Sequence, residues 1–389
     1  MDFSYSEEQE LLRNSVTRFL ADHYDYDAFR QVSRSEAGRR PECWRQFAEM
    51  GLLGAALPEA YGGLGGSAVE TMIIMEAFGR ALVVESYVPT VVIAGGLLHL
   101  GGSEAQKREW LPKIASGEAM FAFAFAEPNG RFNLADLTTT AKRRGSDYLL
   151  NGQKAVVLGA PFADHLIVTA RSSGGRRDEN GVSVLIVDKR AKGISTRDYP
   201  TADGLRASEI TFENVTIPAD ALVGEEDHGL QPINQIVDRA IAAHCAEALG
   251  AMRVMHEATI EYAKTRKQFG AAIGSFQVLQ HRMVDMFMQL EEAASMTLMA
   301  TLKLDGNPVE RSRAVSATKV QIGKAGRFVG QNAVQIHGGI GMTDELALGH
   351  YFKRVTMLDA LYGNVDHHLQ RYIALSKKMD SHGGQEPQS

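Results

Sequence analysis

Two segments of the sequence carry side chains suited to a phosphorylated ligand, and the first is Arg266–Gln277. Arg266 has a planar guanidinium whose paired donors match a diphosphate. Phe269 offers an aromatic face for stacking, and Gln277 can exchange hydrogen bonds with ribose or ribityl hydroxyls. The same residues also fit a plain turn between two helices in which Arg266 is only solvated. The local pattern by itself favours that plainer interpretation.

The second segment is Gln335-Ile336-His337-Gly338-Gly339-Ile340-Gly341. Gly338 and Gly339 have no side chains, so a bound ligand can approach their backbone closely. Gln335 adds an amide that both donates and accepts hydrogen bonds. Because His337 has no cysteine or carboxylate at metal-ligand spacing, we expect no metal site here. The segment is a candidate for binding a ligand largely through its backbone.

The first segment lies between two long helical patterns, in which apolar residues recur at helical spacing. These residues are Met252, Met255, Ile260 and Ala263 before the segment, and Phe276, Leu279, Met283, Met286 and Leu290 after it. Helical patterns also run from a capping box at Ser6 and Gln9 to about Ser116. They return from Leu230 to about Lys378, so both segments join helices.

The middle of the chain changes to the alternating spacing of strands. Phe121–Ala126 alternates strictly. Further strands are predicted at 137–142, 148–157, 165–171, 182–188 and 209–215. Helices, then strands, then helices indicate an α+β protein with an N-terminal α-helical domain, a middle antiparallel β domain and a C-terminal four-helix bundle. We place these at 1–118, 119–226 and 227–379, with a disordered polar tail at 380–389.

The composition limits the class of protein. The 389 residues carry a net charge of -6 without a long basic run, so we expect no nucleic-acid partner. Cys43 and Cys245 are the two cysteines, which excludes a disulfide framework. The acidic start lacks the apolar stretch of a signal peptide, and the most apolar window, 81–102, is interrupted by Glu85 and Pro89. We expect a soluble, cytoplasmic protein with no membrane insertion.

The two segments, in this order and between these elements, resemble motifs of the acyl-CoA dehydrogenase family, and the resemblance extends from residue 3 to about residue 375. In that family the matching residues bind the FAD of a neighbouring subunit, with the glycine pair close to its adenosine diphosphate end. The residues that match here are Arg266, Phe269, Gln277, Gln335, Gly338 and Gly339. The resemblance implies an acyl-CoA substrate, FAD as cofactor and an electron-transfer flavoprotein as electron acceptor. It also implies tetramers built through the C-terminal bundles.

The family reaction removes the α proton of an acyl-CoA thioester with a carboxylate base and passes the β hydride to the flavin. The usual base is a glutamate in an Ile-Tyr-Glu-Gly-Thr run. The matching run here is Ala360-Leu361-Tyr362-Gly363-Asn364, which places either Tyr362 or Gly363 at the position of the glutamate. Neither is a carboxylate, and a phenol with a pKa near ~10 is a poor base at neutral pH.

Some family members carry the base on the first C-terminal helix, just before an arginine. Asp238 stands at that position here, followed by Arg239, for which the resemblance implies contact with the substrate. Asp238 keeps the carboxylate but shortens its reach by about 1.5 Å, which matters for proton transfer in a fixed geometry. Asp238 is therefore the candidate catalytic residue. The alternative, which the sequence favours, is that it only pairs with an arginine and holds the helix.

The resemblance also implies a pocket for the subunit's own flavin in the β domain, and this pocket is degraded. Ala126, Phe132 and Leu158 stand where the family has hydroxyl side chains, and Val156 replaces a tryptophan. The framework residues Glu127, Pro128, Gly152 and Lys154 remain. Each missing hydrogen bond to a buried ligand atom costs on the order of 1–3 kcal/mol, so losing three would weaken FAD binding by several decades.

The losses are one-sided, because the residues that reach a neighbour's flavin are intact. This resembles the α2β2 acyl-CoA dehydrogenases of bacterial steroid side-chain degradation, in which FAD is shared across a heterodimer. We therefore expect a FAD-completing, base-deficient subunit of a heterotetramer that acts on bulky CoA esters, such as those of steroid side chains. Two alternatives stay open: a self-sufficient homotetrameric dehydrogenase using Asp238, and a non-enzymatic acyl-CoA-binding scaffold.

Overall fold

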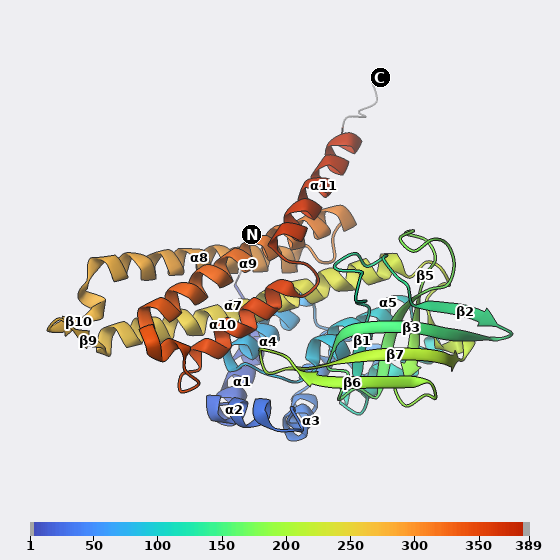
Figure 1. The fold of residues 1–389 in the computed structure, drawn as a ribbon, viewed down its shortest axis with the longest axis horizontal. Helices are drawn as coiled ribbons and strands as arrows, with labels where there is room; N and C mark the ends of the chain where they lie inside the picture. The colour runs from blue at the N-terminus through green and yellow to red at the C-terminus, as the bar shows by residue number, and fades with distance from the viewer. Residues whose placement is uncertain (1–3, 384–389) are drawn as a thin grey trace. The chain divides into compact units, whose positions relative to one another are not determined.

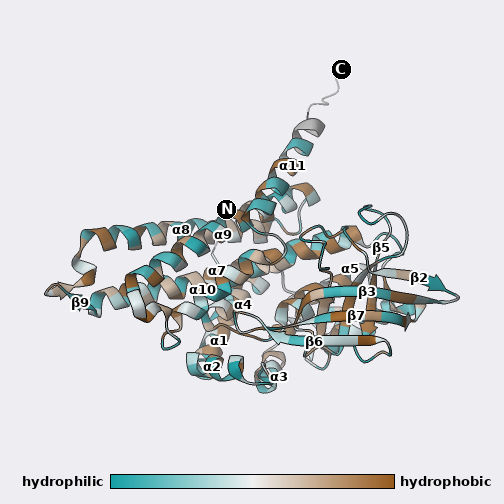
Figure 2. Ribbon diagram, viewed as in Figure 1, coloured by the Kyte–Doolittle hydropathy of each residue, from teal (hydrophilic) through white to brown (hydrophobic). Residues whose placement is uncertain are grey.

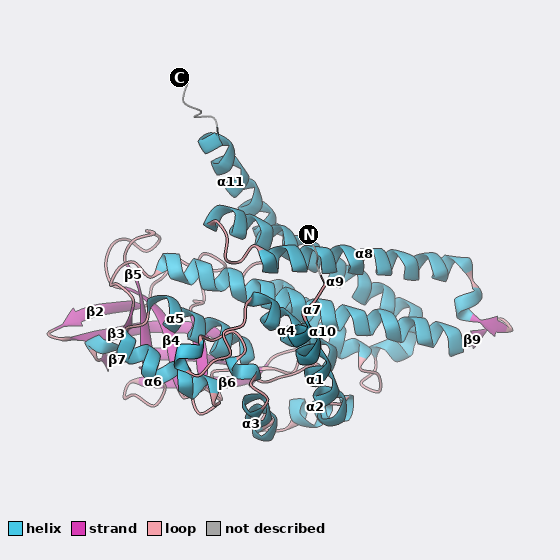
Figure 3. Cartoon of the chain, turned by 180° about the vertical axis from the view of Figure 1, so that it is seen from behind, coloured by secondary structure: helices cyan, strands magenta, loops and turns pink. Residues whose placement is uncertain are grey.

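The computed structural model describes residues 4–383, which divide into two compact units. Within the described residues, the first unit contains 4–30, 68–83 and 241–383, and the second contains 31–67 and 84–240. The first unit is helical, whereas the second combines a sheet with shorter helices (Figures 1 and 3). Helix α11 ends at Gly383, and residues 384–389, the larger part of the predicted tail, lie outside the described residues.

The sheet of the second unit has the strand order β6-β7-β3-β2-β4-β5-β8. The strands are β1 (Phe121–Ala124), β2 (Thr140–Arg144), β3 (Asp147–Leu158), β4 (His165–Arg171), β5 (Val182–Asp188), β6 (Ile194–Pro200), β7 (Arg206–Ile217) and β8 (Leu222–Val223). Most neighbouring strands in the sheet pair antiparallel, as the sequence predicts. However, β1 runs parallel to β4, with Phe121 opposite His165, so the sheet is mixed.

The helices of the second unit are α3 (Pro41–Glu49), the π-helix η3 (Val88–Gly95), α5 (Gly96–Gly101), α6 (Glu104–Ala115) and the start of α7 (Leu230–Thr265). Helix α2 (Tyr26–Arg34) crosses from the first unit into the second. Thr90 on η3 joins this helical part to β1, because its hydroxyl donates to the Phe121 carbonyl at 3.0 Å and accepts from the Phe121 N–H at 3.1 Å. The apolar window 81–102 therefore contains buried helix, as expected. Its central part, Val88–Gly95, is a π-helix, which is rare in proteins.

The helical unit is built around α9 (Pro308–His337), which packs against α8 (Gln277–Leu302), α10 (Leu348–Ala360) and α11 (Val365–Gly383). Small residues on α9 permit this packing. A Cβ added to Gly330 would lie 2.2 Å from Phe352, and one added to Gly326 would lie 3.3 Å from Val355, both on α10. Apolar residues line the buried sides of these helices (Figure 2).

Helix α4 (Ala68–Ala81) approaches α7 closely within the same unit, whereas α1 (Glu7–His23) packs on α4. A Cβ added to Gly79 would lie 1.9 Å from the Glu247 carbonyl oxygen, and one added to Gly250 would lie 2.0 Å from that of Glu76. At each of the two glycines, the backbone of one helix therefore contacts the backbone of the other. Helix α1 begins with the predicted capping box, in which Ser6 and Gln9 satisfy each other's backbone N–H groups.

Candidate functional site

The first candidate segment forms a projecting hairpin after α7, not the simple helix-to-helix turn expected from the sequence. Strands β9 (Lys267–Gln268) and β10 (Ala271–Ala272) pair antiparallel. Phe269 and Gly270 connect them with φ values of 54° and 81°, the left-handed pair of a tight hairpin turn. The Phe269 side chain is 93% exposed, and Arg266 and Gln277 are also exposed. All three side chains are available to a ligand.

The second candidate segment lies at the end of α9, where Gly338 takes φ 66° and the chain turns into the short 3-10 helix Gly338–Met342. A Cβ added to Gly338 or Gly339 would meet nothing within 4 Å, so this backbone is open to a close approach. Gln335 is exposed one turn earlier on α9. The segment therefore offers open backbone at Gly338 and Gly339 and an exposed amide at Gln335, as its residue types predict.

The structure brings the two segments together through Tyr262 on α7. The Tyr262 hydroxyl donates to the His337 carbonyl at 3.3 Å, and the two rings stack with centroids 4.4 Å apart. The Tyr262 carbonyl accepts from the Arg266 N–H at 2.9 Å, so the same residue also anchors the hairpin. An exposed guanidinium, an exposed aromatic ring, two amides and open glycine backbone therefore share one end of the helical unit. A guanidinium of this kind can pair with phosphate oxygens, and an exposed aromatic ring can stack on a planar base.

The β-domain segment that would hold the chain's own flavin keeps a rigid framework. Lys154 is fully buried, and its Nζ lies 2.9 Å from Oε1 of Glu127 and donates to the Phe125 carbonyl at 3.1 Å. Glu127 also accepts from the backbone N–H groups of Thr138 at 2.7 Å and Thr139 at 3.0 Å. Burial alone would raise the pKa of Glu127, but the charge of Lys154 and hydrogen bonds from Thr138, Lys154 and Thr139 hold it at about 2.

The side chains on this framework do not fit a flavin well. Ala126, Phe132 and Leu158 are half-buried and carry no hydroxyl. Val156 is 47% exposed and takes φ 52°, which a β-branched residue rarely adopts, at an irregularity in the pairing of β3 with β7. This segment keeps the buried Glu127–Lys154 pair, but these four side chains offer no hydroxyl donor to a ligand.

The loop between α10 and α11 carries Tyr362 and Gly363, the two residues that the family resemblance aligns with the glutamate base. A Cβ added to Gly363 would lie 2.4 Å from the His367 ring and 2.8 Å from Nε2 of His368, and φ is 118°, so a larger residue here would be strained and would displace these rings. Nε2 of His368 also lies 3.1 Å from the Tyr362 carbonyl. Burial raises the pKa of the Tyr362 phenol, so Tyr362 is not a base near neutral pH.

The candidate base Asp238 lies on the part of α7 that belongs to the second unit. It is fully buried, whereas the following Arg239 is half-buried. A buried carboxylate is compatible with a catalytic role and equally with a structural one.

Sequence reasoning missed a buried group in the helical unit, formed by His244, Glu247 and Arg354. Nδ1 of His244 lies 3.0 Å from Oε2 of Glu247, and Nη1 of Arg354 donates to Oε1 of Glu247 at 2.6 Å. Arg354 is fully buried and also donates to the Val83 carbonyl at 2.9 Å. The available signal was Glu247 itself, a charged residue inside the apolar run Cys245-Ala246-Glu247-Ala248-Leu249. The described residues contain no cluster that could hold a metal ion.

Comparison with known families decides the identity of the fold. Models of the N-terminal, middle and C-terminal domains of acyl-CoA dehydrogenases match residues 6–118, 122–215 and 227–374. The chain belongs to the acyl-CoA dehydrogenase family. Its three-part architecture, with a β domain between helical regions, is that of the family.

Related proteins agree with this assignment. The chain is 30% identical over 386 residues to a probable acyl-CoA dehydrogenase, YngJ, of Bacillus subtilis, covering 96% of this chain and 98% of YngJ. It matches the Tcur3481-Tcur3483 steroid ACAD with a TM-score of 0.87 at 28% identity, covering 96% and 99% of the two chains. It matches the FAD complex of PigA with a TM-score of 0.89 at 26% identity, covering 98% and 99%.

Acyl-CoA dehydrogenases are FAD-dependent oxidoreductases, and this chain is such an enzyme by family. The hairpin and the glycine segment are exposed and open to a close approach, whereas the four β-domain side chains Ala126, Phe132, Val156 and Leu158 carry no hydroxyl. Among residues 4–383, no helix is long and apolar enough to cross a membrane.

Proposed function

We propose that this chain is the FAD-completing, base-deficient subunit of a heterotetrameric acyl-CoA dehydrogenase. One observation carries the proposal: the segments that would reach a neighbour's flavin are intact and exposed, whereas the chain's own pocket lacks hydroxyl donors. A homotetramer would have no subunit able to supply the missing donors. A sister subunit with an intact pocket and a carboxylate base would supply both.

In this proposal each residue has a defined task. Arg266 pairs with the diphosphate of the partner's cofactor, and Phe269 stacks on it from the tip of the hairpin. Gln277 and Gln335 bond its hydroxyls, while Gly338 and Gly339 let it approach the backbone. Bound FAD supplies the hydride acceptor for desaturation of the acyl-CoA. The acceptor of its electrons would be an electron-transfer flavoprotein.

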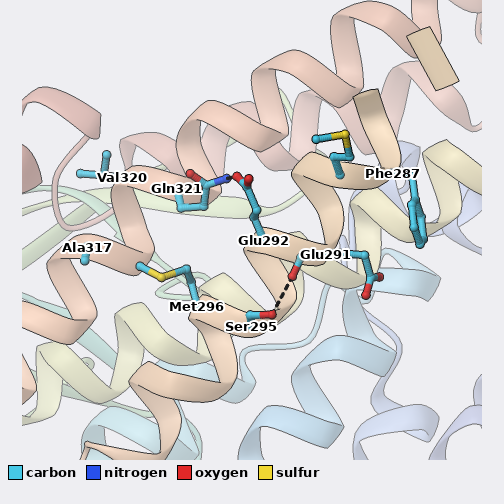
Figure 4. A pocket seen from close by; sticks show the side chains of 9 residues that line it. Phe287, Glu291, Glu292, Ser295, Met296, Ala317, Val320 and Gln321 are labelled. Atoms are coloured by element: carbon cyan, nitrogen blue, oxygen red, sulfur yellow. Dashed lines mark hydrogen bonds between the residues drawn. The ribbon is translucent and has the colours of Figure 1, made fainter. Parts of the chain in front are cut away.

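An apolar groove on the helical unit supports the proposal that a partner subunit binds there. The groove has a volume of about 620 Å³ and lies between α8 and α9 (Figure 4). It is lined by Phe287, Met288, Glu291, Glu292, Ser295, Met296, Ala317, Val320 and Gln321. Phe287 and Met288 are 49% and 54% exposed, which is unusual for such large apolar side chains. We propose that the sister subunit covers this face.

The substrate class is a CoA thioester with a bulky acyl group such as a steroid side chain. The likeness to a steroid ACAD named for two proteins, Tcur3481 and Tcur3483, supports both the substrate class and the two-subunit assembly. A hetero-oligomer would therefore account for the one-sided loss of flavin ligands in this chain.

The direct test is Arg266→Ala in the complex co-expressed with its sister subunit. We expect the FAD content of the purified complex to fall at least 10-fold, because a charged hydrogen-bond pair with the diphosphate is worth about 1.5–3 kcal/mol. Lys264→Ala, which removes an exposed cation paired with Glu261 just before the hairpin, is the matched control and should retain FAD. A fully loaded Arg266→Ala complex would show that the hairpin does not bind the partner's cofactor.

A second candidate is a self-sufficient homotetramer with Asp238 as base, because this fully buried residue is the carboxylate that the family resemblance places before an arginine on α7. It predicts that the chain alone desaturates acyl-CoA and that Asp238→Asn abolishes this turnover. Turnover that survives Asp238→Asn would eliminate it. A flavin-free scaffold, the third alternative, would bind acyl-CoA without FAD in any complex.

A further inference from the structure

The loop 172–181, which joins β4 to β5, is held in place by Arg171, the last residue of β4. The Arg171 side chain is buried, and its Nη1 donates to the carbonyls of Asp178 at 2.9 Å and Asn180 at 2.7 Å. Its Nη2 donates to the Arg176 carbonyl at 3.1 Å. Surface loops are usually more mobile than the strands they join, but one guanidinium holds this loop at three carbonyl oxygens. The loop therefore presents its side chains from a fixed backbone.

A buried carboxylate fixes two side chains of this loop. Nη2 of Arg171 also donates to the Ala135 carbonyl at 2.6 Å, which brings the segment before β2 against the loop. The next residue, Asp136, is buried and accepts from Nε of Arg176 and, at 2.9 Å, from Nε of Arg177. Hydrogen bonds from the two arginines hold the pKa of Asp136 below its usual value, so it is a carboxylate near neutral pH. One negative charge thus holds two guanidinium groups close together.

The outer donors of both arginines are open to solvent. Their side chains are 45% and 70% exposed, and in the part of the chain that the structure describes their Nη groups donate no hydrogen bond. The nearby carboxylate of Asp178 accepts instead from the Gly175 N–H at 2.8 Å, and no ion pair among residues 4–383 joins Glu179 to either arginine. Two positive charges therefore stand against the single negative charge of Asp136.

We propose that Arg176 and Arg177 form a binding site for a phosphate dianion. Guanidinium groups pair with phosphate oxygens in bidentate geometry, and an added anion balances the charge that Asp136 leaves uncompensated. A terminal phosphate offers three acceptor oxygens and close to two negative charges, so it suits two adjacent guanidinium groups better than a carboxylate does. Two sources have this chemistry: the 3′-phosphate of CoA, which rests on the proposed function, and free inorganic phosphate.

The test is isothermal titration calorimetry of the full-length chain with CoA, with dephospho-CoA, which lacks the 3′-phosphate, and with inorganic phosphate. Arg177→Gln removes one guanidinium but keeps an amide donor for Asp136, which also retains Arg176. We expect the dissociation constant of the phosphate-bearing ligand to rise about 10-fold in this variant, since a hydrogen bond between two charged groups is lost. Arg190→Gln, at an exposed arginine 3.5 Å from Asp188 in the same unit, is the matched control and should bind like wild type.

A preference of the wild-type chain for CoA over dephospho-CoA that Arg177→Gln abolishes identifies CoA as the source. Inorganic phosphate that binds wild type and binds Arg177→Gln about 10-fold more weakly, without that preference, identifies free phosphate. The inference is overturned if wild type shows neither behaviour, or if Arg177→Gln with a wild-type melting temperature binds as tightly as wild type.

These titrations need neither flavin nor a sister subunit, so they are independent of the shared-flavin proposal. A yellow homotetramer whose preference for CoA depends on Arg177 contradicts the proposed function only. A colourless chain that binds neither the 3′-phosphate nor inorganic phosphate contradicts the anion site only.

Discussion

At the scale of single residues, the Glu127–Lys154 pair maintains the β-domain framework although the ligands around it are lost. Both side chains are buried, so removing one partner leaves the other charge without compensation. Glu127 further holds the backbone of Thr138 and Thr139. The pair is thus a structural element, as its sequence context indicated, and its effect on stability should depend on pH.

We expect Glu127→Gln to destabilise the protein by about 3 kcal/mol at pH 7, because Lys154 then stays buried without its carboxylate. The pKa of Glu127 in the folded chain is about 2, below the value of ~4.3 for an unfolded glutamate. Its contribution is therefore complete above about pH 4.3 and is lost as the pH falls towards 2. Urea unfolding measures the free energy of unfolding of Glu127→Gln and of wild type at pH 6 and pH 3. The difference between the two proteins should be smaller at pH 3.

Glu179→Gln, an exposed carboxylate of the same unit, is the control and should match wild type at both values of pH. If Glu127→Gln lowered the free energy of unfolding equally at pH 6 and pH 3, the depressed pKa of Glu127 would be refuted.

The segment Arg266–Gln277 could be selected from the sequence because its residue types match a family motif, and its contact with a partner's cofactor stays a prediction. Arg266, Phe269 and Gln277 are exposed, but the short hairpin that carries Phe269 was not predicted. The buried group of His244, Glu247 and Arg354 could not be found this way. Glu247 and Arg354 are 107 residues apart, and only the packing of α10 on the helical unit brings them together.

At the scale of elements, strands with strong apolar patterns were predictable to the residue. β4 (His165–Arg171) and β5 (Val182–Asp188) match their predicted limits because both are almost wholly buried. β6 (Ile194–Pro200) was missed, since this edge strand is mostly exposed and its sequence, ISTRDYP, has no apolar alternation. The parallel pairing of β1 also has no local signal, because it depends on how the chain returns to the sheet.

The close contact of α4 with α7 leads to a prediction at this scale. Alanine is the better helix former by about 1 kcal/mol, yet a Cβ on Gly79 would lie 1.9 Å from the Glu247 carbonyl oxygen. The helices would have to separate, so we expect Gly79→Ala to destabilise the protein by about 2 kcal/mol. Differential scanning calorimetry would measure the change in melting temperature.

Gly306→Ala serves as the control, because a Cβ there would meet only the Lys303 carbonyl at 3.3 Å in an exposed turn. A Gly79→Ala variant that melts at or above the wild-type temperature would mean that the two backbones are not in contact.

At the scale of the whole molecule, the chain has the family fold, and we propose that its cofactor ligands are divided between the two units. The candidate segments of the helical unit are exposed, and the β-domain unit keeps the buried Glu127–Lys154 pair without hydroxyl side chains at Ala126, Phe132 and Leu158. The family and its three-part fold were predictable from motifs and from the order of helices and strands. The identity of the sister subunit is a property of the assembly, and the sequence of this chain does not specify it.

The central claim is that this chain binds FAD only together with a sister subunit. The deciding measurement is the visible absorbance and solution mass of the chain purified alone and of the co-expressed pair. We predict a colourless or substoichiometric chain alone, and a heterotetramer of the pair with FAD bound. A yellow homotetramer with about one FAD per chain would contradict the account, because it would show that the β-domain pocket holds flavin without the missing hydroxyls.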